Sequence, residues 1–319
     1  MALTMLLTSA GRRAGLLDCF RQSAAELGLP LRVLACDLEP DWSAACHRAD
    51  ARFAVPRVDD PGYVDALLAI VRAEGVGLVV PTIDTELSPL ADARAAFEAA
   101  GARVHVGASE DVAVARDKLK TAVALERAGV PVPWTMAIEA VEDPEALAWP
   151  LFLKPSGGSA SRGIQIVRVA ADLPASSTEP MVLQQLLEGP EYTVNVFVDA
   201  AGRLRCVVPH RRVRVRAGEV EKGVTERDPL FDLLAEGVGK AMPGLRGAAC
   251  FQLILDRSSG PRVFEINARF GGGYPLAHEA GAPFARWLLE ETAGLASSCG
   301  DGWQAGVTML RYDAAVFIR

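Results

Sequence analysis

Apolar and polar residues follow two different periods along the first third of the chain. Short apolar runs lie near residues 3–8, 31–36, 76–80 and 103–106, and helical patterns lie between them, near 12–27, 61–74 and 85–100. Strands that alternate with helices in this way are typical of a doubly wound parallel sheet. The pattern therefore predicts a Rossmann-like α/β domain at the start of the chain.

The pattern changes near residue 112. Residues 109–129 predict helix, and the Val-Pro-Val-Pro sequence at 130–133 forces an extended chain, because a residue before proline avoids the helical region. Beyond this point, longer alternating runs are typical of antiparallel sheet. We therefore expect a domain boundary near 112 and α+β structure after it, with the final VTMLRYDAAVFIR as a closing strand.

Composition and charge exclude several classes of protein. Half of the residues (50%) are hydrophobic and 23% are charged, which is a globular composition. The net charge of −7 repels phosphate backbones and anionic lipid, so we expect neither nucleic acid nor a membrane as partner. The first residues do not resemble a signal peptide, and the six cysteines lack metal-ligand spacing. A cytoplasmic protein is the expectation.

A small-residue loop follows an apolar strand in the segment WPLFLKPSGGSASRGIQIV, residues 149–167. The strand ends at Lys154, and a second strand follows the loop. Small residues let backbone N–H groups approach phosphate oxygens, and a lysine supplies the positive charge that a net-acidic protein must provide locally. The segment therefore indicates phosphate binding; a flexible turn is the alternative, and the spacing is not that of a Walker A loop.

Residues 246–270 predict two alternating strands joined by a turn at 257–260. Because side chains alternate with period two, each strand has a polar side. One side of the first strand carries Gln252, Ile254 and Asp256, and one side of the second carries Val263, Glu265, Asn267 and Arg269. A turn centred between Ser258 and Ser259 places Gln252 opposite Glu265.

This row combines amide and carboxylate oxygens with a guanidinium. Hard oxygen ligands suit Mg²⁺ that is shared between a protein and nucleotide phosphates, so Gln252, Glu265 and Asn267 are candidate metal ligands. Arg269 could neutralise charge on a transferring phosphoryl group or acyl phosphate. The alternative is a solvated polar face.

Further polar groups are candidates for binding a substrate. In the basic strand HRRVRVR, period two puts Arg212, Arg214 and Arg216 on one side, with Lys222 in the next strand, and an anion could bind there; a charged edge strand is the alternative. Gly271 and Gly272 follow the strand that carries Glu265 and Asn267, and they could present backbone N–H groups to a carboxylate or acyl phosphate. Residues 81–86 follow a strand at the ligand-binding edge of the first sheet, which makes Glu86 a candidate, unless the segment only caps a helix.

With Lys154, its loop and the sequence Glu-Ile-Asn-Ala-Arg at 265–269, the chain resembles the ATP-grasp superfamily, most closely the ATP-binding halves of carbamoyl phosphate synthetase and biotin carboxylase. The resemblance spans nearly the whole chain. It implies a Rossmann-like preceding domain at 1–112, a small lobe at 113–190, and a large lobe with the metal and phosphate site at 191–319. The two lobes would grip ATP between antiparallel sheets.

The resemblance also implies residue roles. Lys118 and Lys154 would contact the ATP phosphates, Gln184, Gln185 and Leu187 the adenine, and Glu191 the ribose. The glycine-rich flap over the phosphates corresponds to a set of small residues, namely Ser156, Gly157, Gly158, Ser159 and Gly163. The chain departs from many relatives in having two glutamines at the hinge, and from biotin carboxylase in having Gln252 at a metal position, where carbamoyl phosphate synthetase also has glutamine.

The function implied is an ATP- and Mg²⁺- (or Mn²⁺-) dependent ligase that joins a small-molecule carboxylate to an amine, or to a thiol, through an acyl phosphate, with ADP and phosphate as products. Lys154 and Arg269 would be catalytic. Three alternatives stay open: phosphorylation of bicarbonate or carbamate, as in carbamoyl phosphate synthetase; a nucleotide-binding module without turnover; and a dinucleotide-dependent oxidoreductase. The habit of the family allows a homodimer.

Overall fold

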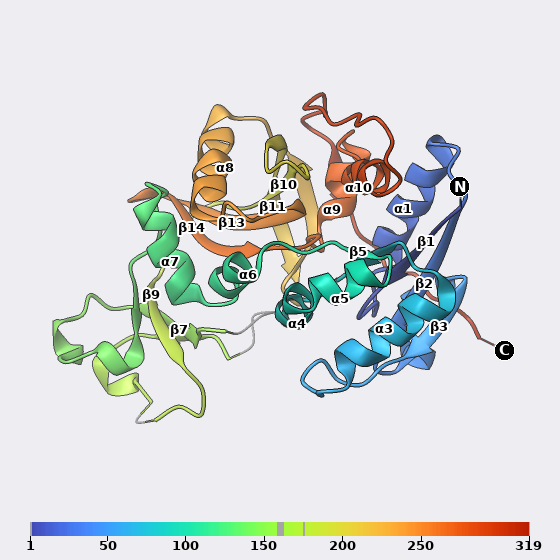
Figure 1. The fold of residues 1–319 in the computed structure, drawn as a ribbon. Coiled ribbons are helices and arrows are strands. Elements are labelled where there is room, and N and C mark those ends of the chain that lie inside the picture. Colours follow the sequence, from blue (N-terminus) through green and yellow to red (C-terminus); the bar gives the residue numbers. More distant parts are fainter. Residues whose placement is uncertain (1, 158–162, 175, 319) are drawn as a thin grey trace.

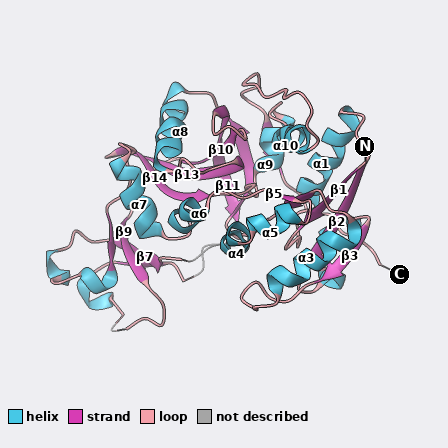
Figure 2. Cartoon of the chain, in the orientation of Figure 1, coloured by secondary structure: helices cyan, strands magenta, loops and turns pink. Residues whose placement is uncertain are grey.

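The computed structural model describes residues 2–157, 163–174 and 176–318. Their strands form three sheets, and helices cover the sheets (Figures 1 and 2). The expected fold class, with a parallel α/β domain followed by antiparallel α+β lobes, is confirmed. In the part of the chain that the structure describes, no helix has both the length and the apolar character that crossing a bilayer requires.

The first domain is a parallel sheet with the strand order β3-β2-β1-β4-β5. Its strands are β1 (Leu3–Leu7), β2 (Leu31–Asp37), β3 (Ala51–Ala54), β4 (Leu78–Val80) and β5 (Arg103–Val104). The helices between them are α1 (Ala14–Glu26), α2 (Ala44–Arg48), α3 (Tyr63–Glu74), α4 (Leu87–Asp92) and α5 (Arg94–Ala99). The helix expected at 85–100 is thus two helices that meet at Ala93.

Two further helices connect this domain to the small lobe: α6 (Ser109–Ala115) and α7 (Lys118–Arg127). The sequence predicts one helix here, but Asp117 interrupts it. Its carboxylate accepts hydrogen bonds from the backbone N–H groups of Leu119 and Lys120, so it caps the start of α7. This cap fixes Lys118 at the first position of a new helix.

The small lobe is an antiparallel sheet with the order β6-β9-β7-β8. Its strands are β6 (Thr135–Ala137), β7 (Leu151–Pro155), β8 (Gln165–Val167) and β9 (Met181–Gln185). The lobe has its own small hydrophobic cluster, which includes Leu151, Leu153 and Leu183. In Figure 1 it extends to one side of the molecule.

The large lobe is an antiparallel sheet with the order β14-β13-β10-β11-β12-β15. Its strands are β10 (Glu191–Val198), β11 (Leu204–Arg216), β12 (Glu219–Thr225), β13 (Gly247–Asp256), β14 (Gly260–Asn267) and β15 (Thr308–Leu310). Helices α8 (Pro229–Ala241), α9 (Tyr274–Glu279) and α10 (Phe284–Thr292) belong to the same part of the chain. The closing strand expected at the end of the chain is limited to β15.

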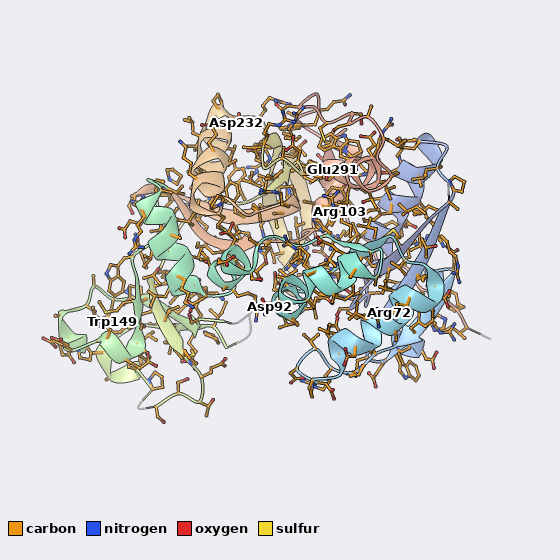
Figure 3. The ribbon with its side chains drawn as sticks, viewed as in Figure 1. Arg72, Asp92, Arg103, Trp149, Asp232 and Glu291 are labelled. Carbon is orange, nitrogen blue, oxygen red and sulfur yellow. The ribbon has the colours of Figure 1, made fainter. Side chains whose placement is uncertain are left out.

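The large lobe and the first domain share one apolar core. Phe20 of α1 packs edge to face against Phe270, and one buried cluster contains Leu17 together with Phe284 and Trp287 of α10. Figure 3 labels Arg103 of β5 and Glu291 of α10, whose Nη2 and Oε2 atoms are 2.6 Å apart. The loops of the first domain are therefore held rigidly against the large sheet, which positions them to contribute to a shared cavity. The limits at 112 and 190 stay a prediction.

Candidate active site

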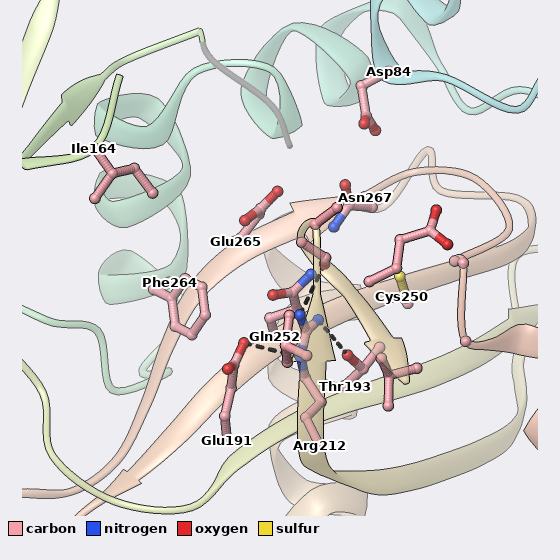
Figure 4. A pocket seen from close by; sticks show the side chains of 18 of the residues that line it. Asp84, Ile164, Glu191, Thr193, Arg212, Cys250, Gln252, Phe264, Glu265 and Asn267 are labelled. Carbon is pink, nitrogen blue, oxygen red and sulfur yellow. Dashed lines mark hydrogen bonds and ion pairs between the residues drawn. The ribbon is translucent and has the colours of Figure 1, made fainter. Parts of the chain in front are cut away.

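A cavity of about 460 Å³ lies where the three sheets meet, and its size is within the range of small-molecule sites. Figure 4 shows many of its side chains. The residues that line it come from the loops of the first domain, from the small lobe and from the large sheet. One part of the wall is apolar and consists of Phe152, Ile164, Leu187, Ile254 and Phe264.

Two lysines bring positive charge to the cavity. The Nζ of Lys154, at the end of β7, donates a hydrogen bond of 2.6 Å to Oε1 of Gln184, and Lys118 lies at the start of α7. Burial lowers the pKa of Lys154 to about 8; the charge of Lys118 lowers it too, and Glu265 opposes the shift. Burial likewise lowers the pKa of Lys118. An anion with several charges would relieve the repulsion between these two ammonium groups.

The predicted pairing of Gln252 with Glu265 is confirmed, since the two residues are directly opposite each other on β13 and β14. The turn is one residue tighter than expected, because Asp256 pairs with Gly260. A register shift next to Phe264 compensates for this difference, so that Gln252 still lies opposite Glu265. This shift turns Val263 into the core opposite Leu253 and lets Phe264 line the cavity beside Glu265. The expectation that Val263 shares the polar side is therefore wrong.

Gln252, Glu265 and Asn267 all line the cavity and supply one carboxylate and two amide oxygens. These are hard ligands of the kind that Mg²⁺ prefers. Within the described ranges, no group of three or more His, Cys, Asp or Glu side chains could hold a metal. The oxygens of Gln252, Glu265 and Asn267 would suit a magnesium ion shared with nucleotide phosphates.

Arg269 is fixed beside this oxygen set by a residue of the first domain. Its Nη2 lies 2.6 Å from Oδ2 of Asp84 and 2.9 Å from Oδ1 of Asn267. Burial acts to lower the pKa of Arg269, but the neighbouring carboxylate of Asp84 raises it overall, so the side chain stays charged. Its Nε is buried and has no hydrogen-bond partner among the described residues. Arg269 also lines the cavity, so its positive charge lies beside the oxygen set.

Only the first of the predicted substrate arginines reaches the cavity. The Nε of Arg212 lies 3.1 Å from Oε1 of Glu191 at an angle that makes an ion pair rather than a hydrogen bond. The register of β11 against β12 shifts on both sides of Arg214. Val215 consequently lines the cavity, whereas Arg214 is exposed and pairs with Glu221. Lys222 is also exposed and does not line the cavity, so the period-two argument is wrong beyond Arg212.

Glu86 is not a substrate residue, because it is fully buried and its carboxylate is used inside the first domain. It accepts hydrogen bonds from the backbone of Thr82 and Ile83 and from the hydroxyl of Tyr63. Two residues away, Asp84 lines the cavity instead. The alternative interpretation of this segment, as a cap, fits Glu86.

The predicted hinge residues Gln184, Gln185, Leu187 and Glu191 all line the cavity. The flap residues are placed differently. Ser156 donates a hydrogen bond of 2.9 Å to Asp117 and thus supports the start of α7, while Gly157 is exposed and Gly163 does not line the cavity. Gly158 and Ser159 lie outside the described residues.

A second charged cluster was not foreseen. Glu219, at the start of β12, accepts a hydrogen bond of 2.8 Å from Arg311 Nη1 and forms an ion pair with Arg13, whose Nη1 lies 2.9 Å from Oε1. Arg13 and Glu219 line the cavity, as do Gly271 and Gly272. No local pattern in the sequence marks Glu219 or Arg311.

Comparisons with known proteins agree with this geometry. Residues 5–105 match the family model "PylC-like, N-terminal domain", and residues 115–273 match the ATP-grasp domain model. A D-alanine--D-alanine ligase of Marinobacter nauticus is 38% identical over 99 residues, which cover 28% of this chain and 30% of that protein. The chain therefore spans less than a third of the length of this relative.

Solved structures share the fold over almost the whole chain. Biotin carboxylase from Campylobacter jejuni superposes with a TM-score of 0.74 at 17% identity, covering 94% of this chain and 73% of that one. An L-amino acid ligase from Bacillus licheniformis gives 0.69 at 19% identity, covering 93% and 75%. N5-carboxyaminoimidazole synthetase from Staphylococcus aureus, solved with ADP, gives 0.71 at 16% identity, covering 94% and 80%.

Proposed function

The chain belongs to the ATP-grasp family, and from that premise we propose that it is an ATP- and Mg²⁺-dependent ligase that joins a carboxylate to an amine through an acyl phosphate. One observation carries the proposal. Lys154 from the small sheet and Glu265 from the large sheet line the same cavity, together with Lys118, Gln252 and Asn267. A triphosphate needs cations on one side and a metal with oxygen ligands on the other, and this cavity offers both.

In the proposed arrangement the apolar wall with Phe152 and Leu187 receives the adenine, and Glu191 is within reach of the ribose. Lys118 and Lys154 hold the phosphates, and the charge that they carry is balanced when the nucleotide binds. Gln252, Glu265 and Asn267 would hold magnesium, which when bound would offset the negative charge of the phosphates.

The proposed chemistry has two steps. A carboxylate oxygen of the substrate attacks the γ-phosphorus, the bond from that phosphorus to the β–γ bridging oxygen breaks, and ADP leaves with the electron pair. An amine then attacks the acyl carbon, the bond to phosphate breaks, and the nitrogen loses a proton. Arg269, held by Asp84, is positioned to stabilise charge on the group being transferred.

Phosphate release from ATP tests this proposal. Wild-type protein with Mg²⁺ should release phosphate when pools of small carboxylic acids and amines are supplied together. Lys154→Met and Glu265→Gln should abolish the release while leaving the folded state intact. The matched controls are Lys222→Met and Glu142→Gln, which change the same side-chain types at exposed positions outside the cavity.

Three results would contradict the proposal or its site assignment. Binding of MgADP without turnover on any pool would favour a nucleotide-binding module. Release stimulated by bicarbonate and ammonia alone would favour the carbamoyl phosphate type of chemistry. Wild-type turnover in Lys154→Met or Glu265→Gln would show that the site assignment is wrong.

A further inference from the structure

We propose that Glu86 is a positioning residue, whose buried carboxylate holds together the two loops through which the first domain reaches the cavity. This inference rests on the proposed ligase function, because it concerns the geometry of the same site. It gives a role to a fully buried acid that no step of the proposed chemistry uses.

The first domain contributes to the cavity through two loops that follow neighbouring strands. The first loop, residues 8–13, follows β1, and the second loop, residues 81–84, follows β4. The two strands pair in parallel, with Leu7 opposite Val80, so both loops leave the same edge of the sheet. In the described part of the chain, the cavity residues of this domain all belong to these loops: Arg12, Arg13, Thr82, Ile83 and Asp84.

The carboxylate of Glu86 accepts hydrogen bonds from both loops. Its Oε2 accepts a bond of 2.9 Å from the hydroxyl of Ser9 in the first loop. Its Oε1 accepts from the backbone N–H groups of Thr82 at 2.7 Å and Ile83 at 3.1 Å in the second loop. The hydroxyl of Thr82 also donates a bond of 2.7 Å to the backbone carbonyl of Ser9. The two loops are therefore tied to each other, and Glu86 bridges them.

The ionised form of Glu86 suits this arrangement. Besides Ser9 and the two backbone groups, the hydroxyl of Tyr63 on α3 donates to Oε2 at 2.6 Å. An ionised carboxylate has about four acceptor sites, one for each of these donors, and protonation would turn one site into a donor. Burial raises the pKa of Glu86, although the hydrogen bonds from Tyr63 and from the backbone of Ile83 oppose the shift.

The first loop has a conformation that needs such support. Ser9 has a φ of 46°, in the left-handed region that a residue with a Cβ atom seldom adopts. Residues in such conformations persist where their surroundings hold them. Both the hydroxyl and the carbonyl of Ser9 are held, the first by Glu86 and the second by Thr82. The loop from which Arg12 and Arg13 extend is thus fixed at its base.

Each loop carries a charge that meets the large lobe. Asp84 in the second loop, labelled in Figure 4, accepts a bond of 2.6 Å from the proposed catalytic Arg269. Arg13 in the first loop has its Nη1 2.9 Å from Oε1 of Glu219. A misplacement of about 1 Å caused far from the reacting atoms can lower a rate about a hundredfold. Glu86 therefore acts on the reaction through the residues that its loops align.

Two hydroxyl donors to the same oxygen of Glu86 allow a matched test. Ser9→Ala removes the donor of the first loop, whereas Tyr63→Phe removes the donor of α3, none of whose described residues lines the cavity. With pooled carboxylic acids and amines, Ser9→Ala should lower kcat for phosphate release by about tenfold or more. KM for ATP and MgADP affinity should stay at wild-type values, because the loops carry none of the residues assigned to the nucleotide.

Tyr63→Phe should keep the kcat of wild type, although urea denaturation should show that it is destabilised. Glu86→Gln should lower kcat at least as much as Ser9→Ala, again with KM for ATP unchanged. A purely structural role of Glu86 would instead make the loss of kcat follow the loss of stability in every variant. Equal falls of kcat in Ser9→Ala and Tyr63→Phe, or a wild-type kcat in Ser9→Ala, would overturn the inference.

Hydrogen exchange separates failure of this inference from failure of the ligase function. In Ser9→Ala, the backbone amides of residues 8–13 should exchange faster than in wild type, and in Tyr63→Phe they should exchange at the wild-type rate. If exchange follows this pattern but wild type releases no phosphate from ATP, the ligase function is wrong and the tie between the loops stands. If wild type turns over ATP and the exchange of residues 8–13 is the same in both variants, the inference is wrong and the ligase function survives.

Discussion

Replacing Asp84 with asparagine removes the only carboxylate seen to pair with Arg269 in the described part of the chain, while the size and shape of the side chain stay the same. The pair joins the first domain to the segment just after β14 over a Nη2–Oδ2 distance of 2.6 Å, and the two side chains are only 12% and 11% exposed. Asp84→Asn therefore leaves a buried guanidinium charge without its counter-charge. The variant measures how strongly the first domain holds the proposed catalytic arginine.

The magnitude follows from burial. Removing one partner of a buried ion pair costs about 3–5 kcal/mol of stability, because the remaining charge is uncompensated. Asparagine keeps an oxygen that can accept from Nη2, and Asn267 still accepts at 2.9 Å. A retained hydrogen bond of this kind offsets about 1 kcal/mol. We therefore expect Asp84→Asn to lower the free energy of unfolding by about 2–4 kcal/mol.

Urea denaturation followed by tryptophan fluorescence measures this loss. The control is Asp18→Asn, because Asp18 accepts two hydrogen bonds from Arg48, of 2.7 and 2.9 Å, but the side chains are 46% and 43% exposed. An exposed pair contributes about 0–1 kcal/mol, so this variant should change little. Equal losses in the two variants would refute the argument from burial. In an Arg269→Gln background, Asp84→Asn should cost clearly less, since the charge to be compensated is gone.

Three further predictions follow from the charges of the cavity and the core. Burial, and then the charge of Lys118, lowers the pKa of Lys154 to about 8, so much of this side chain is neutral at about pH 8.5. A bound phosphate favours the charged form, so MgADP binding at this pH should take up protons. Calorimetry in two buffers of different ionisation enthalpy measures the uptake, and it should vanish in Lys154→Met; uptake that persists there would point to another group. Glu265→Gln should raise the magnesium concentration that half-saturates ADP-loaded protein more than about tenfold, because loss of a group that only hydrogen-bonds a metal ligand already lowers metal affinity by roughly tenfold. An unchanged magnesium dependence would remove Glu265 from the metal site. Burial, and then the charge of Arg103, lowers the pKa of His105 from 6.5 to about 3. Between these two pH values His105 is protonated in the unfolded chain but not in the folded one. The free energy of unfolding should therefore fall as pH falls from 6.5 toward 3. Urea titrations at pH 7 and pH 5 should show a smaller fall in His105→Gln than in wild type, and the same fall in both would contradict this origin.

A large part of the site could be predicted from local patterns of the sequence. The strand that ends at Lys154 and the hairpin that pairs Gln252 with Glu265 were predictable, because hydrophobic alternation and a short turn are both local properties. The same period-two argument failed where the strands are irregular. The register shifts beside Arg214 and next to Phe264 turn Arg214 away from the cavity and Val263 into the core.

The sequence by itself determined the alternation of strands and helices in the first domain and the pairing of Gln252 with Glu265, because these depend on neighbours a few positions apart, whereas the two antiparallel lobes followed from the resemblance to a known family. Only the tertiary structure decided which charges meet across the cavity. Asp84 and Arg269 are separated by 185 positions, and Arg13, Glu219 and Arg311 come from both ends and the middle of the chain. Such pairs form because a shared apolar core presses the first domain against the large sheet, and no local pattern encodes where two distant surfaces touch.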